Sequence, residues 1–218
     1  MKKLIFLTTL LCCISIFSAK SQNVLMTFST GISPEQTPAT HFIFVNRSSP
    51  RNEFTFDLAQ VKASYFIGFG AKYDVQPFFF SAEAQYNRRE YIYNIKYTFP
   101  GFGRSEQSQL LSETMSVINV PLTLGVNLGK IDVTSGFLPQ IILSQDTDLK
   151  NLAGYNQNLK WLRFGWHSGV AANIGDVRVG VSMQMDFNNY ADHAYIRNQS
   201  LALQSRSTRM LGTLAYQF

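Results

Sequence analysis

The sequence predicts an all-β protein, an eight-stranded antiparallel up-and-down transmembrane β-barrel with a filled polar interior and first strands extended above the membrane. Residues 159–190 contain two runs of strict apolar and polar alternation around the turn Gly175-Asp176, and a period of two is typical of a strand. Similar runs of roughly ten residues recur, long enough for a tilted strand to cross a membrane. One face is large and apolar, whereas the other is rich in Gly, Ser, Thr and Asn, which suits a narrow lumen.

The composition excludes nucleic acid as a partner before any motif is considered. The chain has 218 residues and a formal net charge of +5, which suits a single domain. Three of its 19 cations, Lys2, Lys3 and Lys20, lie in the first 21 residues, and most others are scattered singly. A protein that follows nucleic-acid phosphates needs a concentrated basic stripe instead.

Residues 1–21 are predicted to be a secretory signal peptide, which leaves residues 22–218 as the outer-membrane β-barrel domain. Two lysines precede the apolar run 4–17, and Ala19-Lys20-Ser21 forms a small-x-small cleavage site. The run is shorter than the roughly 20 residues that a membrane-spanning helix needs. Both cysteines, Cys12 and Cys13, lie within it. The mature chain is therefore expected to have no disulfide, no catalytic thiolate and no cysteine metal site.

The first half of the mature chain contains four expected strands, at 24–33, 40–46, 52–58 and 61–73. Pro34 and Pro38 interrupt the ladder after the first strand, because proline donates no backbone hydrogen bond. The outward apolar set changes parity between Leu58 and Val61, which predicts a β-bulge.

The next strand, at 78–99, predicts where the membrane ends. Its outward apolar residues are at even positions up to Tyr86, but beyond Glu90 the apolar residues are at odd positions, beginning with Tyr91 and Tyr93. We expect these later residues to take over the outward face.

Three breaks in the pattern, at 34–38, 59–61 and 87–90, then fall at about one height on neighbouring strands. We interpret this height as the outer membrane boundary. Above it, the first strands are expected to continue as a twisted sheet edged by the tyrosines.

The second half is more regular. It contains expected strands at 118–128, at 131–144, in the two arms of 159–190, and at 207–218, with a tight turn at Gly129-Lys130 and loops at 100–113, 146–158 and 191–203. Three short connections therefore alternate with four long ones, which places both termini in the periplasm. The last strand ends in Tyr216-Gln217-Phe218. This ending resembles the signal by which barrel assembly machinery recognises its substrates, so Tyr216 and Phe218 are the expected assembly signal.

Two local patterns carry a resemblance to a known family. Ile118-Asn119-Val120-Pro121-Leu122 is similar to a family strand pattern, and Gly136-Phe137-Leu138-Pro139 is similar to its following Gly-Pro strand, although two residues separate the Gly from the Pro here. The chain resembles the small outer-membrane β-barrel proteins of Bacteroidota, the PorT-like group. The resemblance implies the barrel fold, an outer-membrane location and an accessory role in secretion or surface assembly.

A soluble lipocalin-like barrel is the competing fold, since alternation alone does not say which face is inside. It would place the apolar residues in the lumen. The small size of most polar-face residues favours the membrane barrel, because an eight-stranded barrel has an interior just wide enough for side chains.

Eight titratable residues are expected to form the interior polar core: Glu83, Arg89, Asp132, Arg163, His167, Arg178, Asp186 and Arg209. The charges are nearly balanced in sign. We expect them to pair across the lumen rather than line a conducting path, because an unpaired charge in a narrow interior is costly.

No catalytic residue, cofactor or metal site is assigned. His167 could act as a general base, but no nucleophile in a recognisable context accompanies it. Asp146, Asp148 and Asn151 lack the spacing of a calcium loop. We expect a non-enzymatic barrel whose external loops bind a protein, glycan or lipid. Its expected partners are outer-membrane lipids and lipopolysaccharide, the barrel assembly machinery and an envelope protein. The alternatives are a lipid-modifying enzyme and a narrow passive channel.

Overall fold

The computed structural model describes residues 24–36, 40–45, 53–99, 105–196, 199–203 and 206–218. The predicted signal peptide with Cys12 and Cys13, the residue Pro38 and the turn between the second and third expected strands lie outside these described residues. Among the described residues, no helix is long and apolar enough to span a membrane.

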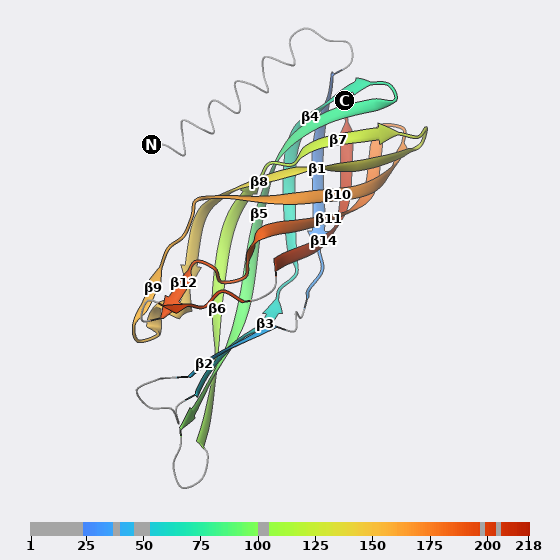
Figure 1. The fold of residues 1–218 in the computed structure, drawn as a ribbon. Helices are drawn as coiled ribbons and strands as arrows, with labels where there is room; N and C mark the ends of the chain where they lie inside the picture. The colour runs from blue at the N-terminus through green and yellow to red at the C-terminus, as the bar shows by residue number, and fades with distance from the viewer. Residues whose placement is uncertain (1–23, 37–39, 46–52, 100–104, 197–198, 204–205) are drawn as a thin grey trace.

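Eight antiparallel strands close into a barrel, as predicted. Seven of them are β1 (Val24–Ser33), β4 (Ser64–Val75), β5 (Phe78–Phe99), β8 (Ile131–Thr147), β10 (Leu162–Ile174), β11 (Val177–Asn189) and β14 (Arg206–Gln217), and the eighth is formed by β6 (Ser105–Asn119) followed by β7 (Leu122–Asn127). Each pairs with its neighbour, and β1 pairs with β14, with Phe28 opposite Tyr216, to close the ring. Figure 1 shows the strands crossing one another at a steep tilt around the lumen.

The apolar face of the strands points outward, which rules out the lipocalin-like alternative. On β10, Trp166 is 43% exposed, whereas the adjacent His167 is 6% exposed. Val181 on β11 and Met210 on β14 are also exposed, whereas Arg209 is buried. An apolar exterior over a polar interior is the arrangement of outer-membrane barrels.

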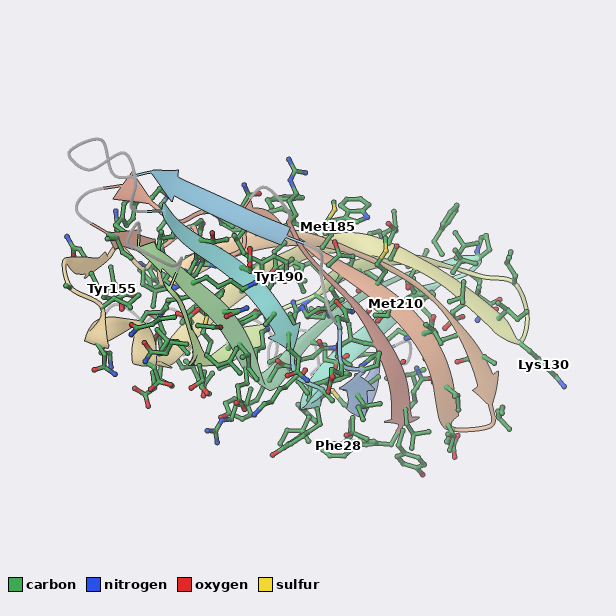
Figure 2. The ribbon with its side chains drawn as sticks, turned by 90° about the horizontal axis from the view of Figure 1, so that it is seen from below. Phe28, Lys130, Tyr155, Met185, Tyr190 and Met210 are labelled. Atoms are coloured by element: carbon green, nitrogen blue, oxygen red, sulfur yellow. The ribbon has the colours of Figure 1, made fainter. Side chains whose placement is uncertain are left out.

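The short turns, the start of β1 and the last residue, Phe218, lie at one end of the barrel. Gly129 and Gly175 occupy the turns after β7 and β10 with φ of +84° and +62°, a conformation that favours glycine. The Met26 amide donates to the carbonyl of Phe218 at 2.9 Å at the same end. In Figure 2, Lys130 projects from this end, whereas Tyr155 lies at the opposite end. We call these the turn end and the loop end.

Strand β5 corrects the prediction that Tyr91 and Tyr93 face outward. The strand is continuous, and its odd residues stay on the inner side along its length, so that Arg89, Tyr91, Tyr93 and Ile95 are all buried. The pairing of β5 with β6 also continues without a shift. The odd residues therefore keep facing inward beyond Glu90, but their side chains change from polar to apolar. Toward the loop end the outer face is polar and the inner face is apolar, as in a water-soluble protein.

The prediction of a loop at 100–113 is wrong for the residues that the structure describes. Residues 105–119 form β6 and pair along the outer half of β5, with Ser105 opposite Phe99. Leu111, Glu113 and Met115 face inward and are buried. The polar composition of this strand reflects its water-facing side.

The predicted bulge between Leu58 and Val61 is confirmed, but the strand boundary is not. Strand β3 (Glu53–Val61) pairs with β5 with a register shift between Leu58 and Gln60. Val61 ends β3 and is buried, so the predicted strand from Val61 to Tyr73 is divided, and β4 begins at Ser64. Gln36 bridges to Val61, and Val61 lies opposite Tyr91. The three breaks in the pattern therefore meet at one height.

The predicted strand at 118–128 is also divided. Val120 and Pro121 lie between β6 and β7, and Val120 is buried where the alternation places it outward. The Val120 amide donates to the Pro139 carbonyl at 2.8 Å, and the Pro121 carbonyl accepts from the Glu83 amide at 3.3 Å. The pairing with β5 keeps its register across the break. The break is thus a local loss of regular β-pairing around Pro121.

The two outer segments predicted as loops are folded. They contain a short 3-10 helix, η1 (Asp148–Asn151), and a three-stranded sheet of β9 (Tyr155–Gln157), β12 (Ala194–Ile196) and β13 (Gln199–Ser200). This sheet lies beside β6 in Figure 1. β2 (Thr40–Val45) pairs with β3. With β3 and the barrel strands, these segments surround an apolar cluster, which we call the outer core: Phe56, Leu58, Val61, Tyr91, Tyr93, Ile95, Leu111, Met115, Val117, Ile142, Leu149, Leu152, Tyr190, Ala191, Ala194, Leu201 and Leu203.

Candidate functional site

The barrel interior contains three layers of charged side chains, which we call the inner, middle and outer tiers. They follow one another from the turn end toward the loop end. Several strands contribute to each tier.

The inner tier is built around Asp132 of β8, which is fully buried. One carboxylate oxygen lies 3.3 Å from the Arg178 Nε and 3.7 Å from the Lys72 Nζ. Lys72 also lies 3.1 Å from Asp74, and its ammonium is 4.3 Å from the centre of the Phe79 ring. A cation over an aromatic face is attracted by the ring quadrupole. This tier crosses the lumen close to the turns.

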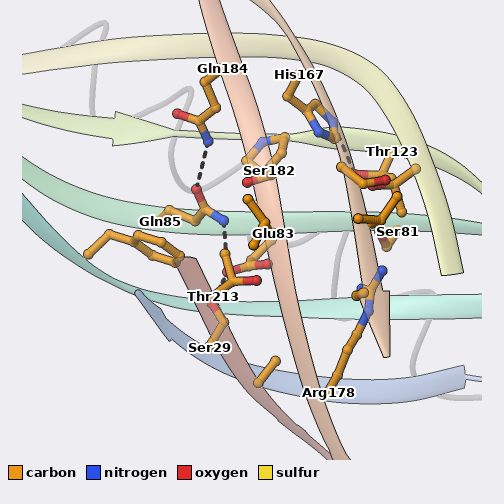
Figure 3. A pocket seen from close by; sticks show the side chains of 18 residues that line it. Ser29, Ser81, Glu83, Gln85, Thr123, His167, Arg178, Ser182, Gln184 and Thr213 are labelled. Atoms are coloured by element: carbon orange, nitrogen blue, oxygen red, sulfur yellow. Dashed lines mark hydrogen bonds between the residues drawn. The ribbon is translucent and has the colours of Figure 1, made fainter. Parts of the chain in front are cut away.

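Above the inner tier lies a cavity of about 90 Å³, which we call the chamber. Glu83 accepts hydrogen bonds there from the Ser29 hydroxyl and, at 3.2 Å, from the Gln85 amide. His167 Nε2 lies 3.2 Å from the Thr123 hydroxyl. Figure 3 shows these side chains converging from several strands. A cavity of this size holds several water molecules.

Glycines on the inner face make room for the charged side chains around the chamber. A Cβ on Gly68 would lie 2.1 Å from a Glu83 carboxylate oxygen, and one on Gly136 would lie 2.7 Å from His167 Nε2. Real Cβ atoms essentially never approach so closely. The small inner face seen in the sequence is therefore space for polar side chains from other strands.

The middle tier is centred on Asp186 of β11. Its carboxylate oxygens lie 3.3 Å from Arg209 and 3.5 Å from Arg89, and Gln140 also donates to one of them. Arg89 donates to the side-chain oxygens of Asn119 at 2.7 Å and Gln140 at 3.1 Å. All five residues are buried. Two cations against one anion leave this layer positive, and the two amide oxygens offset part of the excess.

The outer tier lies beyond the middle tier, within the outer core: Tyr93 belongs to both, and Glu113 lies between Leu111 and Met115 on β6. Fully buried Glu113 accepts a hydrogen bond from the Tyr93 hydroxyl at 2.9 Å and lies 2.7 Å from His193 Nε2. Arg163 donates to Asp192 at 2.8 Å, and the other ring nitrogen of His193 lies 3.6 Å from Asp192. His193 is thus held between two carboxylates, one on a barrel strand and one on an outer loop.

The environment of the outer tier shifts the pKa values of its members. Burial lowers the pKa of His193, but the hydrogen bonds that it donates to Asp192 and Glu113 outweigh this effect, so the pKa lies above its ordinary value of 6.5. Burial raises the pKa of Asp192, but His193 and Arg163 outweigh it and leave that pKa below 3.8. Burial and the charge of Glu113 hold the pKa of Tyr93 well above 10. These directions favour a charged His193 beside an ionised Asp192.

The structure brings together most, but not all, of the residues expected in the interior. Asp132 meets Arg178, and Asp186 meets both Arg89 and Arg209. Arg163, in contrast, pairs with Asp192 of an outer loop, and neither Glu83 nor His167 forms an ion pair with another described residue.

Sequence reasoning missed Lys72, Glu113 and His193 as interior residues. Lys72 has the same parity as Gly68 and Gly70 on β4, and this parity was a usable signal. Glu113 and His193 had none, since both were assigned to loops. A group of three or more metal-ligating side chains is absent from the described part of the chain.

The predicted assembly signal lies on the lipid-facing wall. Tyr216 and Phe218 are exposed, and their rings stack with centroids 6.1 Å apart. Their role in recognition by assembly machinery stays a prediction.

Comparison with known proteins reveals an architectural likeness. No protein-family model matches the chain, and no characterised protein matches its sequence. Among solved structures, the chain is similar to the crystal structure of the outer membrane protease OmpT from Escherichia coli, with 10% sequence identity and a TM-score of 0.41. The similarity covers 90% of this chain and 97% of that one. The resemblance to PorT-like barrels stays a prediction.

Proposed function

We propose that this protein is an integral outer-membrane barrel, closed to free passage of solutes, whose outer half binds an envelope or secreted protein. The observation that carries the proposal is the inversion of polarity along β5. Below Arg89 the barrel is apolar outside, and beyond it the inner face is an apolar core. Because such a core supports a rigid, water-facing unit, the outer half is suited to present a defined binding surface.

The proposed orientation puts the turn end in the periplasm and the loop end outside the cell. Short turns and chain ends on the periplasmic side are usual for bacterial barrels, and the longer connections face outward. The outer core and its three-stranded sheet lie at the loop end. The partner would therefore meet this unit from the external medium.

The layered lumen favours a binding protein over the channel and enzyme alternatives. The inner and middle tiers cross the lumen on either side of the chamber. His167, the residue that could act as general base in the lipid-modifying alternative, lies between these tiers and contacts Thr123. A membrane lipid on the outer wall does not reach it in this closed arrangement.

Two strand edges at the loop end are open in the described part of the chain. β2 pairs only with β3, and residues 105–111 of β6 pair only with β5, whereas the Ser112 amide donates to Asp148. The two edges differ in sequence, since β2 reads Thr-His-Phe-Ile-Phe-Val, whereas 105–111 contains Glu, Gln and Ser. Charged edges resist pairing, while an apolar edge invites it. We place the partner's contact at β2, as an added strand.

A second copy in the same membrane does not fit this edge. β2 runs antiparallel to β3, and β3 runs antiparallel to β5. The chain direction of β2 is therefore the same as that of β5, from the membrane toward the loop end. A strand adding antiparallel to β2 must point toward the membrane, and a copy with the same orientation offers β2 pointing outward. Symmetric self-pairing therefore needs an inverted barrel. A segment of a different protein has no such constraint.

The experiment is site-specific photo-crosslinking in intact cells. A photoreactive residue at Ile43 of β2 should capture one discrete protein. The same residue at Ser108, on the polar open edge, is the matched control and should not. Absence of a captured protein at Ile43, or equal capture at Ser108, would contradict the proposal.

Proline variants test whether backbone pairing is the mode of binding. Successive backbone N–H groups of a strand point to opposite edges. One of the two variants Ile43→Pro and Phe44→Pro therefore removes only a donor on the open edge of β2 and leaves the hydrogen bonds to β3 intact. That variant should fold and lose the cross-link. If both variants fold and both retain it, the partner does not add a strand to β2. Planar-bilayer recordings test the closed lumen in parallel, and ion-selective steps would favour the channel alternative.

A further inference from the structure

The lipid-facing wall of the barrel carries an apolar groove of about 240 Å³ near the outer boundary. Its lining includes Phe28 of β1, Ile67 and Phe69 of β4, Ala84 and Tyr86 of β5, and Ile118 of β6. The pairing register sets Phe28 beside Phe69, and Phe69 beside Ala84. Across the wall, the small methyl group of Ala84 therefore lies next to the rings of Phe69 and Phe28. The groove is the space that this small side chain leaves between large neighbours.

Polar groups lie at the outer end of this groove. Tyr86 is the last lipid-facing residue of β5, and its hydroxyl donates to the Ser116 hydroxyl at 3.4 Å. Arg88 follows two residues later on the same face, about 7 Å along the strand, and lies opposite Ser116. Both Arg88 and Tyr86 are exposed.

Arg88 differs from the neighbouring external cation in having no acidic partner within the described residues. Lys62 forms an ion pair with Glu90, at 2.5 Å. Among the described residues, no carboxylate oxygen lies within 4.0 Å of a guanidinium nitrogen of Arg88. An unpaired guanidinium at the membrane surface is suited to bind phosphate, often through two parallel hydrogen bonds.

We propose that this groove is a binding site for lipopolysaccharide of the outer leaflet, with one acyl chain in the groove and a lipid A phosphate at Arg88. The groove opens on the lipid-facing wall, so water is not its natural occupant. Its polar end faces the outer boundary, which selects a lipid whose headgroup lies in the outer leaflet. The Tyr86 and Ser116 hydroxyls add hydrogen bonds to the sugar or phosphate. The site rests on the orientation proposed above and needs no protein partner, so a failed cross-link at β2 leaves it unaffected.

The experiment measures lipid retention by the detergent-solubilised full-length mature barrel, using native mass spectrometry. Purified protein is delipidated and incubated with lipid A, with phosphatidylglycerol or with phosphatidylcholine. Ala84→Phe fills the groove, and Ala82→Phe, which adds the same ring to the same face two residues away, is its control. Arg88→Gln removes the cation, and Lys62→Gln is its control. Heat-modified gel mobility verifies that each variant is folded, and Ala84→Leu replaces Ala84→Phe if the latter is not.

We expect the wild type and both control variants to retain lipid A in preference to the two phospholipids. Arg88→Gln should weaken retention about tenfold, the loss expected for one charge-assisted hydrogen bond. Ala84→Phe should reduce it at least as much. Equal retention by Ala84→Phe and Ala82→Phe would overturn the groove, and equal retention by Arg88→Gln and Lys62→Gln would overturn the phosphate contact. Equal binding of either phospholipid would overturn the assignment to lipopolysaccharide.

Discussion

Removing the Asp186 carboxylate should destabilise the barrel more than any neutral change in the lumen. Asp186→Ala leaves Arg89 and Arg209 buried without the anion that lies 3.5 Å and 3.3 Å from them. Breaking a buried pair in this way costs roughly 3–5 kcal/mol, because an uncompensated charge remains. Arg89 keeps its hydrogen bonds to Asn119 and Gln140, so we expect about 3 kcal/mol rather than twice that amount.

The assay for this prediction is reversible urea unfolding of the refolded protein in lipid vesicles, followed by gel mobility. The matched control is Gln184→Ala, because Gln184 is a buried neutral residue of the same strand and faces the same lumen. It should cost only about 1 kcal/mol. Adding Arg209→Leu to Asp186→Ala should recover part of the loss, since one of the two unpaired cations is then gone. If Asp186→Ala cost no more than Gln184→Ala, the middle tier would not be an electrostatic layer.

Two further predictions concern the wall and the outer tier. Val181→Arg puts a charge on the lipid face and should cost roughly 2–4 kcal/mol of unfolding free energy near the midplane. Ser182→Arg faces the lumen and should cost less. Urea unfolding in vesicles measures both variants, and a larger loss for Ser182→Arg would mean that the barrel is inside out. The pH dependence of stability follows from His193 and Asp192, whose folded pKa values are respectively raised above 6.5 and lowered below 3.8. The His193 contribution should be complete below about pH 6.5 and lost as pH rises through its folded pKa, while that of Asp192 should be present above about pH 3.8 and lost as pH falls through its folded pKa. Unfolding midpoints from pH 3 to 9 check this, and a His193→Gln variant that keeps the full alkaline loss would contradict the assignment.

The barrel could be predicted from the sequence because lipid and lumen impose opposite chemistry on alternate residues. Within the membrane band, alternation therefore reports backbone geometry directly, as on β11, where Val181 faces out and Ser182 faces in. The same reasoning failed on β5 at Tyr91. There the surroundings change from lipid to water, and the apolar residues move to the inner face while the strand continues unchanged.

The candidate site was only partly predictable for a related reason. Residues of the membrane strands, such as Asp132 and Asp186, showed their inward position through local alternation. The contact between Glu113 and His193 joins positions 80 residues apart, one of them in an outer loop. No local pattern encodes such a contact, because it depends on how the outer segments fold over the barrel.

The position of the outer boundary and the parity of β5 across it can be tested in one measurement. After Cys13 the chain has no cysteine, so single cysteines placed at each position from 78 to 96 are labelled in intact cells with a membrane-impermeant maleimide. We predict labelling at positions 88, 94 and 96, and protection at every lipid-facing position through 86 and at the odd positions from 89 onward. Strong labelling at positions 91, 93 and 95, or at positions 80 to 86, would contradict the inverted outer half that supports the proposed function.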